Sequence, residues 1–143
     1  MIRFFGGRVM TLANDIETQD IEVWTEGSKI VFVGKPKAEE LDGKVFEREY
    51  DLKGNLLMPS FKNAHTHSAM TFLRSYADDM PLQDWLFKQI FPMEAKLDGE
   101  KVYWLTKLAI LEYLTTGCTA AFDMYFELDD YVKACVETVS YTH

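Results

Sequence analysis

The stretch "LLMPSFKNAHTHSAM", residues 56–70, places two of the three histidines of the chain, His65 and His67, directly behind an apolar segment. That segment lacks the alternation of a half-exposed strand, which predicts a strand buried on both faces, as in a parallel sheet. At positions i and i+2 of an extended strand, both imidazole rings leave the same face while Thr66 points away. Such a pair can ligate one divalent cation. The alternative is an incidental pair of polar rings that are solvated or cap backbone groups.

The residues that follow predict alternating helices and strands. A short helix begins after Pro81 and ends before Pro92. A longer helix is capped by Asp98 and ends at Gly117, and a further helix begins near Asp129. Between these two helices, "CTAAFDMYF" (residues 118–126) reads as a second buried strand. We expect the apolar stripe of the long helix to consist of Val102, Leu105, Leu108, Ala109 and Leu111.

The residues before Leu56 have a different character. Residues 20–34, "DIEVWTEGSKIVFVG", predict a β-hairpin with its turn at 26–28. Residues 45–55 alternate apolar and charged side chains, as a half-buried antiparallel strand does. We therefore expect a small β segment over residues 1–55 and the opening units of a parallel α/β domain over residues 56–143.

Composition excludes several classes of protein. With 143 residues, about half of them hydrophobic, the chain is expected to fold as about one ordinary domain. Its net charge of -8 argues against binding to nucleic acid or to an anionic membrane surface. The sequence shows neither a signal peptide nor an apolar stretch long enough to span a bilayer. Cys118 and Cys135 are too few for a disulfide scaffold, so we expect a cytoplasmic protein with reduced thiols.

Residues 57–125 resemble the amidohydrolase superfamily, and within it the metal-dependent aminohydrolases that include methylthioadenosine and S-adenosylhomocysteine deaminases. The resemblance is carried by "MPSFKNAHTHSAMTFLRSYADDMPLQDWL", "FPMEAKL" and "GCTAAFDMY". Ser60 stands where the family usually has glycine. The resemblance implies a (β/α)8 TIM barrel preceded by a small β-sandwich. Residues 1–55 would be the N-terminal β-sandwich segment, and residues 56–143 the opening part of an incomplete barrel.

The resemblance also implies one divalent metal ion, zinc or iron, held in part by His65 and His67. The family completes this site with two later histidines and an aspartate, and a later glutamate moves protons. No matching motifs occur here, and nothing around His143 resembles a ligand, so we expect no catalytic residue in this chain. A complete barrel typically takes about 250 residues. The sequence therefore resembles an N-terminal fragment, inactive alone and with weak or absent metal binding.

Two residues are candidates for substrate binding. Glu94 matches the family position whose carboxylate binds the sugar hydroxyls of a nucleoside, and its alternative is a solvated side chain beyond Pro92. Trp85 is a candidate for stacking on a purine ring, or equally a core residue of its helix. Arg74 is expected to pair with Asp78 or Asp79. The implied substrate is a small heterocycle, namely an adenosine-like nucleoside, with a triazine, guanine or another cyclic amidine as the alternative.

A competing hypothesis treats the chain as non-catalytic. An unclosed parallel sheet exposes strand edges and apolar faces, which predicts that the chain self-associates as a homo-oligomer.

Overall fold

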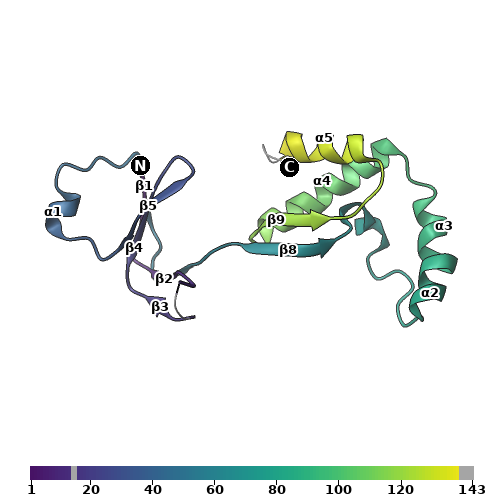
Figure 1. The fold of residues 1–143 in the computed structure, drawn as a ribbon, viewed down its shortest axis with the longest axis horizontal. Coiled ribbons are helices and arrows are strands. Elements are labelled where there is room, and N and C mark those ends of the chain that lie inside the picture. The colour runs from purple at the N-terminus through teal and green to yellow at the C-terminus, as the bar shows by residue number, and fades with distance from the viewer. Residues whose placement is uncertain (14–15, 139–143) are drawn as a thin grey trace. The chain divides into compact units, whose positions relative to one another are not determined.

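The computed structural model describes residues 1–13 and 16–138, so the expectation for His143 lies outside the described residues. The chain divides into two compact units, Met1–Pro59 and Ser60–His143 (Figure 1). None of the helices within the described residues has the length and apolar character needed to cross a bilayer.

In the described part of the first unit, residues 1–13 and 16–59, the chain forms two small sheets and one short helix. The sheets have the strand orders β5-β4-β1-β6 and β3-β2-β7. The elements of this unit are β1 (Ile2–Phe5), β2 (Arg8–Met10), β3 (Thr18–Gln19), β4 (Glu22–Glu26), β5 (Lys29–Gly34), α1 (Ala38–Leu41), β6 (Arg48–Asp51) and β7 (Leu56–Leu57).

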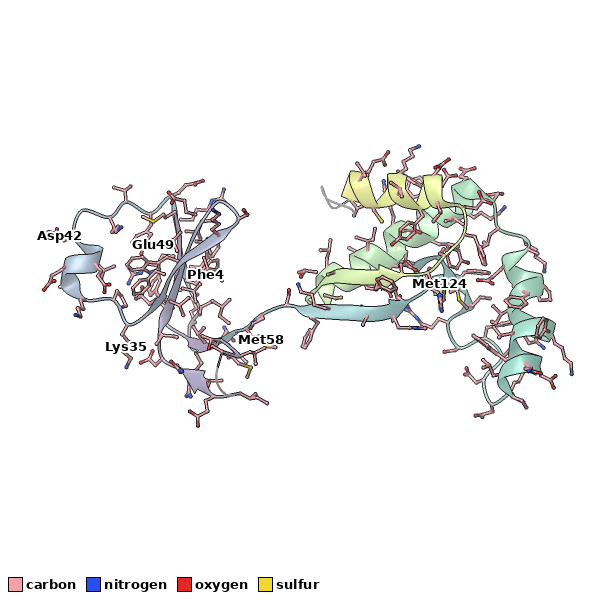
Figure 2. The ribbon with its side chains drawn as sticks, in the orientation of Figure 1. Phe4, Lys35, Asp42, Glu49, Met58 and Met124 are labelled. Carbon is pink, nitrogen blue, oxygen red and sulfur yellow. The ribbon has the colours of Figure 1, made fainter. Side chains whose placement is uncertain are left out.

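The predicted hairpin is confirmed, because β4 and β5 pair antiparallel around Gly27, which has a positive φ of 55°. The strand predicted within residues 45–55 is present as β6, but the predictions of its antiparallel pairing and its half-burial are wrong. β6 pairs parallel with β1, and all four of its residues are exposed. β6 lies at the edge of its sheet, and because its residues on both faces are exposed, the alternation in its sequence does not report burial. Tyr50 instead stacks on Phe4, which Figure 2 labels, with ring centroids 5.3 Å apart.

A charged cluster beside the core of the first unit joins three strands. The Arg3 guanidinium donates to both carboxylate oxygens of Glu22, at 2.7 and 2.6 Å, and to Glu49 at 2.8 Å. Trp24, 3% exposed, donates its indole N–H to the same Glu22 at 2.9 Å. The hydrogen bonds from Arg3 lower the pKa of Glu22, although partial burial opposes the shift.

The second unit is built on two adjacent parallel strands, β8 and β9, and Figure 1 shows α4 and α5 on the same side of them. Helix α4 packs against α5, η1 and β9. The elements of this unit are β8 (Phe61–Thr66), η1 (Ser68–Leu73), α2 (Leu82–Asp84), η2 (Trp85–Ile90), α3 (Phe91–Glu94), α4 (Gly99–Thr115), β9 (Cys118–Asp123) and α5 (Leu128–Thr138).

The helix predicted to end before Pro92 continues through it. Residues 85–90 form a π-helical turn, with Phe91 N–H donating to Leu86 O, and α3 then begins at Phe91 with Pro92 in its first turn. A proline inside a regular α-helix removes a hydrogen bond and clashes with the carbonyl four residues earlier. In the wider π-turn directly before Pro92, a backbone N–H bonds the carbonyl five residues earlier instead of four. Pro92 also lies in the first turn of α3, where a missing N–H costs little because first-turn N–H groups have no partner within the helix. The helical segment therefore extends to Glu94.

Helix α4 confirms its predicted cap, because the Asp98 side chain accepts from Lys101 N–H at 3.0 Å. Its predicted stripe is only partly right. Val102 and Ala109 are buried, but Leu108 and Leu111 are 45% and 56% exposed.

The two strands predicted to be buried on both faces are mostly exposed, and the first is interrupted between β7 and β8. Within the described residues, their sheet has two strands and helices on one side, which leaves the other side open.

Candidate metal and substrate site

The two histidines lie at the carboxyl end of β8. Asn63 pairs with Ala121 and Thr66 with Asp123, so β8 advances three residues while β9 advances two. The extra residue makes a bulge, a feature that redirects side chains at strand ends. Asn63 Oδ1 accepts from His65 N–H at 3.2 Å within this bulge. The rings of His65 and His67 consequently lie 5.0 Å apart, centroid to centroid, with their planes at 82°.

A backbone hydrogen bond defines the protonation of His67. Its Nδ1 lies 2.7 Å from the carbonyl oxygen of Met124, the residue directly after β9, and Figure 2 labels Met124 at that strand end. A carbonyl oxygen can only accept, so Nδ1 must carry the proton in this bond. The lone pair of Nε2 is then free to bind a cation. A histidine ligand fixed through its other nitrogen is the usual arrangement at metal sites.

Further hydrogen bonds hold the residues on either side of His67. The Asp123 carboxylate accepts from Ser68 N–H, with its two oxygens at 3.1 and 3.3 Å. Thr66 Oγ1 lies 2.6 Å from the Tyr113 hydroxyl, and Ser68 Oγ lies 2.9 Å from the same hydroxyl. Groups from β9 and α4 therefore fix the strand end that carries the histidines.

A cavity of about 390 Å³ borders both histidines. Trp85 lies at its wall, half-buried, together with Tyr113 and Arg74. Arg74 does not pair with Asp78 or Asp79 as predicted. It binds Glu112 with two hydrogen bonds of 3.0 and 2.6 Å, because α4 presents a carboxylate that matches the guanidinium fork.

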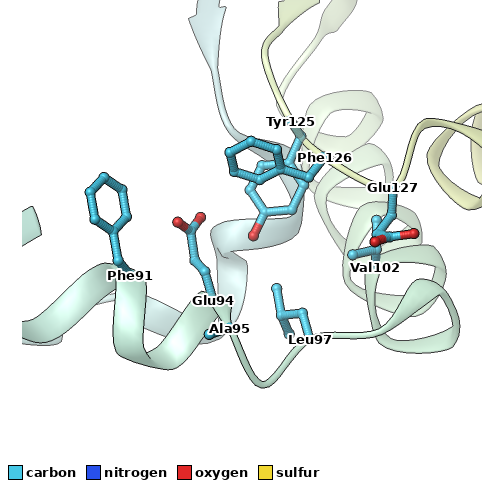
Figure 3. A pocket seen from close by; sticks show the side chains of 8 residues that line it. All are labelled: Phe91, Glu94, Ala95, Leu97, Val102, Tyr125, Phe126 and Glu127. Carbon is cyan, nitrogen blue, oxygen red and sulfur yellow. The ribbon is translucent and has the colours of Figure 1, made fainter. Parts of the chain in front are cut away.

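Glu94 lies at a second cavity of about 330 Å³, formed between α3, the start of α4 and the loop after β9. Figure 3 shows its carboxylate and the Tyr125 hydroxyl pointing toward one another, with Phe91 and Phe126 at the rim. The Tyr125 hydroxyl is buried and has no hydrogen-bond partner among the described residues. Burial raises the pKa of Tyr125, and the negative charge of Glu94 raises it further.

The structure thus groups His65, His67 and Trp85 around one cavity and places Glu94 at another. No set of three or more metal-ligating side chains occurs within residues 1–13 and 16–138. Sequence reasoning missed Tyr113 and Tyr125, because neither lies in a ligand-like pattern. Asp123, at the end of β9, accepts from Ser68 N–H and so holds the rim of the site.

Comparison with known proteins identifies related sequences. A sequence profile described as the amidohydrolase family matches residues 56–142. A 5-methylthioadenosine/S-adenosylhomocysteine deaminase of Desulfitobacterium hafniense is 43% identical over 116 residues, which are 81% of this chain and 27% of that protein. The enzyme of the same name from Pelotomaculum thermopropionicum is 44% identical over 133 residues, or 92% of this chain and 30% of that protein. The chain therefore spans less than a third of the length of these relatives.

A solved structure shows the same fold. An adenosine deaminase from Xanthomonas campestris with bound zinc superposes with a TM-score of 0.85 and 33% identity. The match covers 95% of this chain and 31% of that chain. This likeness confirms the predicted α/β fold class.

Proposed function

Since this chain belongs to the amidohydrolase family, we propose that it supplies two metal ligands and part of the substrate site of a hydrolase. The proposed reaction is hydrolytic deamination of an adenosine-like nucleoside. The observation that carries the proposal is the pair His65 and His67, with the Nδ1 of His67 fixed on Met124 O. Deaminase relatives and a zinc-containing deaminase structure support it.

The two imidazoles fit a divalent metal. Their nitrogens are preferred zinc ligands, and the bond to Met124 O leaves Nε2 of the neutral His67 ring as its free nitrogen. When bound, the metal would act as a Lewis acid that makes the attacking water more acidic. A catalytic zinc site usually has three protein ligands, so we expect this chain alone to bind zinc weakly. Iron is the alternative metal.

Glu94 and Trp85 are proposed to bind different parts of the substrate. A carboxylate can accept hydrogen bonds from two neighbouring sugar hydroxyls, and the cavity of Glu94 combines it with the aromatic side chains Phe91 and Phe126. Trp85 presents an aromatic surface in the cavity of the histidines, suitable for stacking on a heterocyclic base. A triazine or guanine is the competing substrate class.

A chimera tests the proposal. The residues of this chain would replace the matching 116 residues of the Desulfitobacterium relative. Ammonia release would then be measured with 5′-methylthioadenosine, adenosine, guanine and a triazine. We expect activity on the nucleosides, loss of zinc and activity in His65→Ala and His67→Ala, and little change in Lys62→Ala on the same strand. A folded, zinc-loaded chimera that deaminates none of the nucleosides would contradict the substrate assignment.

The role of Glu94 has a matched control in the same cavity, Glu127. Hydrogen bonds to a charged group contribute about 1.5–3 kcal/mol. Glu94→Gln should therefore raise KM for the preferred nucleoside by about tenfold or more, and the effect should shrink for a 2′,3′-dideoxy substrate. Glu127→Gln should change KM little. Equal effects of the two variants would count against a sugar contact by Glu94.

Self-association is a second candidate role for the chain as it stands. On the strand pair, Phe61 and Phe122 are 60% and 77% exposed, and the sheet has unpaired edges in the described residues. Open edges and apolar faces favour pairing between copies. Sedimentation velocity at micromolar concentration should show a dimer or larger species, and a single monomeric species would refute this role.

The proposed compartment is the cytoplasm. Cys118 and Cys135 are free and buried, as expected for structural thiols in a reducing environment. Alkylation of the purified protein in denaturant without reductant should modify both cysteines.

A further inference from the structure

One hydroxyl group bridges the two residues that flank His67. Tyr113, on α4, places its hydroxyl 2.6 Å from Thr66 Oγ1 and 2.9 Å from Ser68 Oγ. Ser68 is only 2% exposed, so water cannot readily replace a lost partner there. A phenol has one proton and can accept as well as donate, so Tyr113 can serve both hydroxyls at once.

This bridge restrains His67 from both sides along the chain. Thr66 is the last residue of β8, and its carbonyl accepts from Met124 N–H at 3.2 Å. Ser68 begins η1, and its N–H binds Asp123. The His67 ring then donates to Met124 O at 2.7 Å. The position of the ring therefore depends on the relative placement of Thr66, Ser68 and the end of β9.

We propose that Tyr113 is a positioning residue that fixes the tautomer and orientation of His67 by bridging Thr66 and Ser68. The proposal rests on the proposed function in one respect, namely that His67 is a metal ligand. Groups that hydrogen-bond a ligating histidine directly change metal affinity about 10–100-fold when removed. Tyr113 acts on His67 through Thr66 and Ser68, so we expect an effect at the lower end of that range. Tyr113 also lines the cavity shared by the two histidines, so its ring forms part of the same site.

Tyr113→Phe is the test variant, and Tyr103→Phe is its matched control. Tyr103 lies on the same helix, and its hydroxyl contacts Glu137 and Lys107 instead of the end of β8. The 143-residue chain labelled with ¹⁵N would be studied without metal, and the imidazole nitrogens of His67 would report the tautomer. We expect a single Nδ1–H tautomer in the native chain and in Tyr103→Phe, and a mixture of tautomers in Tyr113→Phe.

Zinc titration followed on the same signals gives the second readout, since it measures weak as well as strong binding. We expect Tyr113→Phe to bind zinc about tenfold more weakly than the native chain, while Tyr103→Phe binds it as the native chain does. A purely structural role of Tyr113 would lower the unfolding temperature of Tyr113→Phe without changing the tautomer of His67.

The proposal is overturned if the His67 signals of Tyr113→Phe match those of the native chain, or if Tyr103→Phe changes them equally. If Tyr113→Phe does not fold, Thr66→Val and Ser68→Ala replace it as test variants. Each removes one of the two hydroxyls that contact Tyr113 and keeps the tyrosine. Native-like tautomer populations in both would then refute the bridge. If neither the native chain nor any variant binds zinc, the two histidines alone do not hold the metal, and the tautomer result still decides the role of Tyr113.

Discussion

Replacing Val102 by alanine should destabilise the second unit and enlarge the cavity that holds Glu94. Val102 lies in the first turns of α4, is 1% exposed, and lines that cavity. Alanine removes two methyl groups, each contributing about 0.8 kcal/mol when buried, and leaves space that the surroundings only partly fill. The higher helix propensity of alanine returns about 0.5 kcal/mol. We expect a net loss of about 1.5 kcal/mol in the free energy of unfolding.

Val136, on α5 in the same unit, provides the control, because it is 54% exposed. Val136→Ala gains the same helix propensity but loses only about half as much buried apolar surface. Its free energy of unfolding should therefore change by no more than about 0.5 kcal/mol. For a unit of this size, 1 kcal/mol corresponds to about 4–8 °C in Tm, so the two variants should differ measurably.

Thermal unfolding followed by the helical far-ultraviolet circular dichroism signal measures the difference, since α4 and α5 are the longest helices described. Equal losses in Tm for Val102→Ala and Val136→Ala would refute the reasoning. That result would mean that Val102 does not pack as described and that the wall of the Glu94 cavity is wrongly assigned.

Further predictions concern both units. The lowered pKa of Glu22 means that its pairing with Arg3 stabilises the first unit fully above the unfolded-state pKa. This stability is lost as pH falls through the folded-state pKa, so urea unfolding at descending pH should show a decline that Glu22→Gln removes. Tyr125→Phe should leave Tm unchanged or raise it, because the buried hydroxyl has no partner among the described residues, and a fall of several degrees would contradict this. Gly7→Ala should cost about 1–3 kcal/mol, since its Cβ would lie 2.4 Å from Asn55 O, and a native-like unfolding midpoint would refute it.

Features set by neighbouring residues could be predicted from the sequence. The hairpin of β4 and β5 follows from strand-forming residues on either side of a glycine turn, and the start of α4 from an aspartate three residues before the N–H that it binds. In these cases the residues that interact also lie together in the chain. The family resemblance came from motifs of the same local kind, read at intervals along residues 57–125.

Features set by distant partners could not be predicted in this way. β6 pairs parallel with β1, a strand more than 40 residues earlier in the chain, and its own alternating sequence does not encode that pairing. Arg74 had two aspartates nearby in sequence, but it binds Glu112, 38 residues away, once η1 packs on α4. The exposure of β8 and β9 depends on what covers the sheet, and hydrophobic sequence alone could not show that.

The histidine site combines both situations. Its ligand candidates are visible in sequence because imidazole is a rare side chain with a specific chemistry and the two rings are two residues apart. The groups that orient His67 are not visible, since the Met124 carbonyl lies 57 residues away and belongs to the backbone. Most substitutions at Met124 would keep that carbonyl, so a mutational scan could rate the position as tolerant although its backbone fixes the tautomer of His67. Tyr113 differs in this respect, because it acts through its side chain 47 residues from Thr66, and a single oxygen atom can be removed to measure what the bridge contributes.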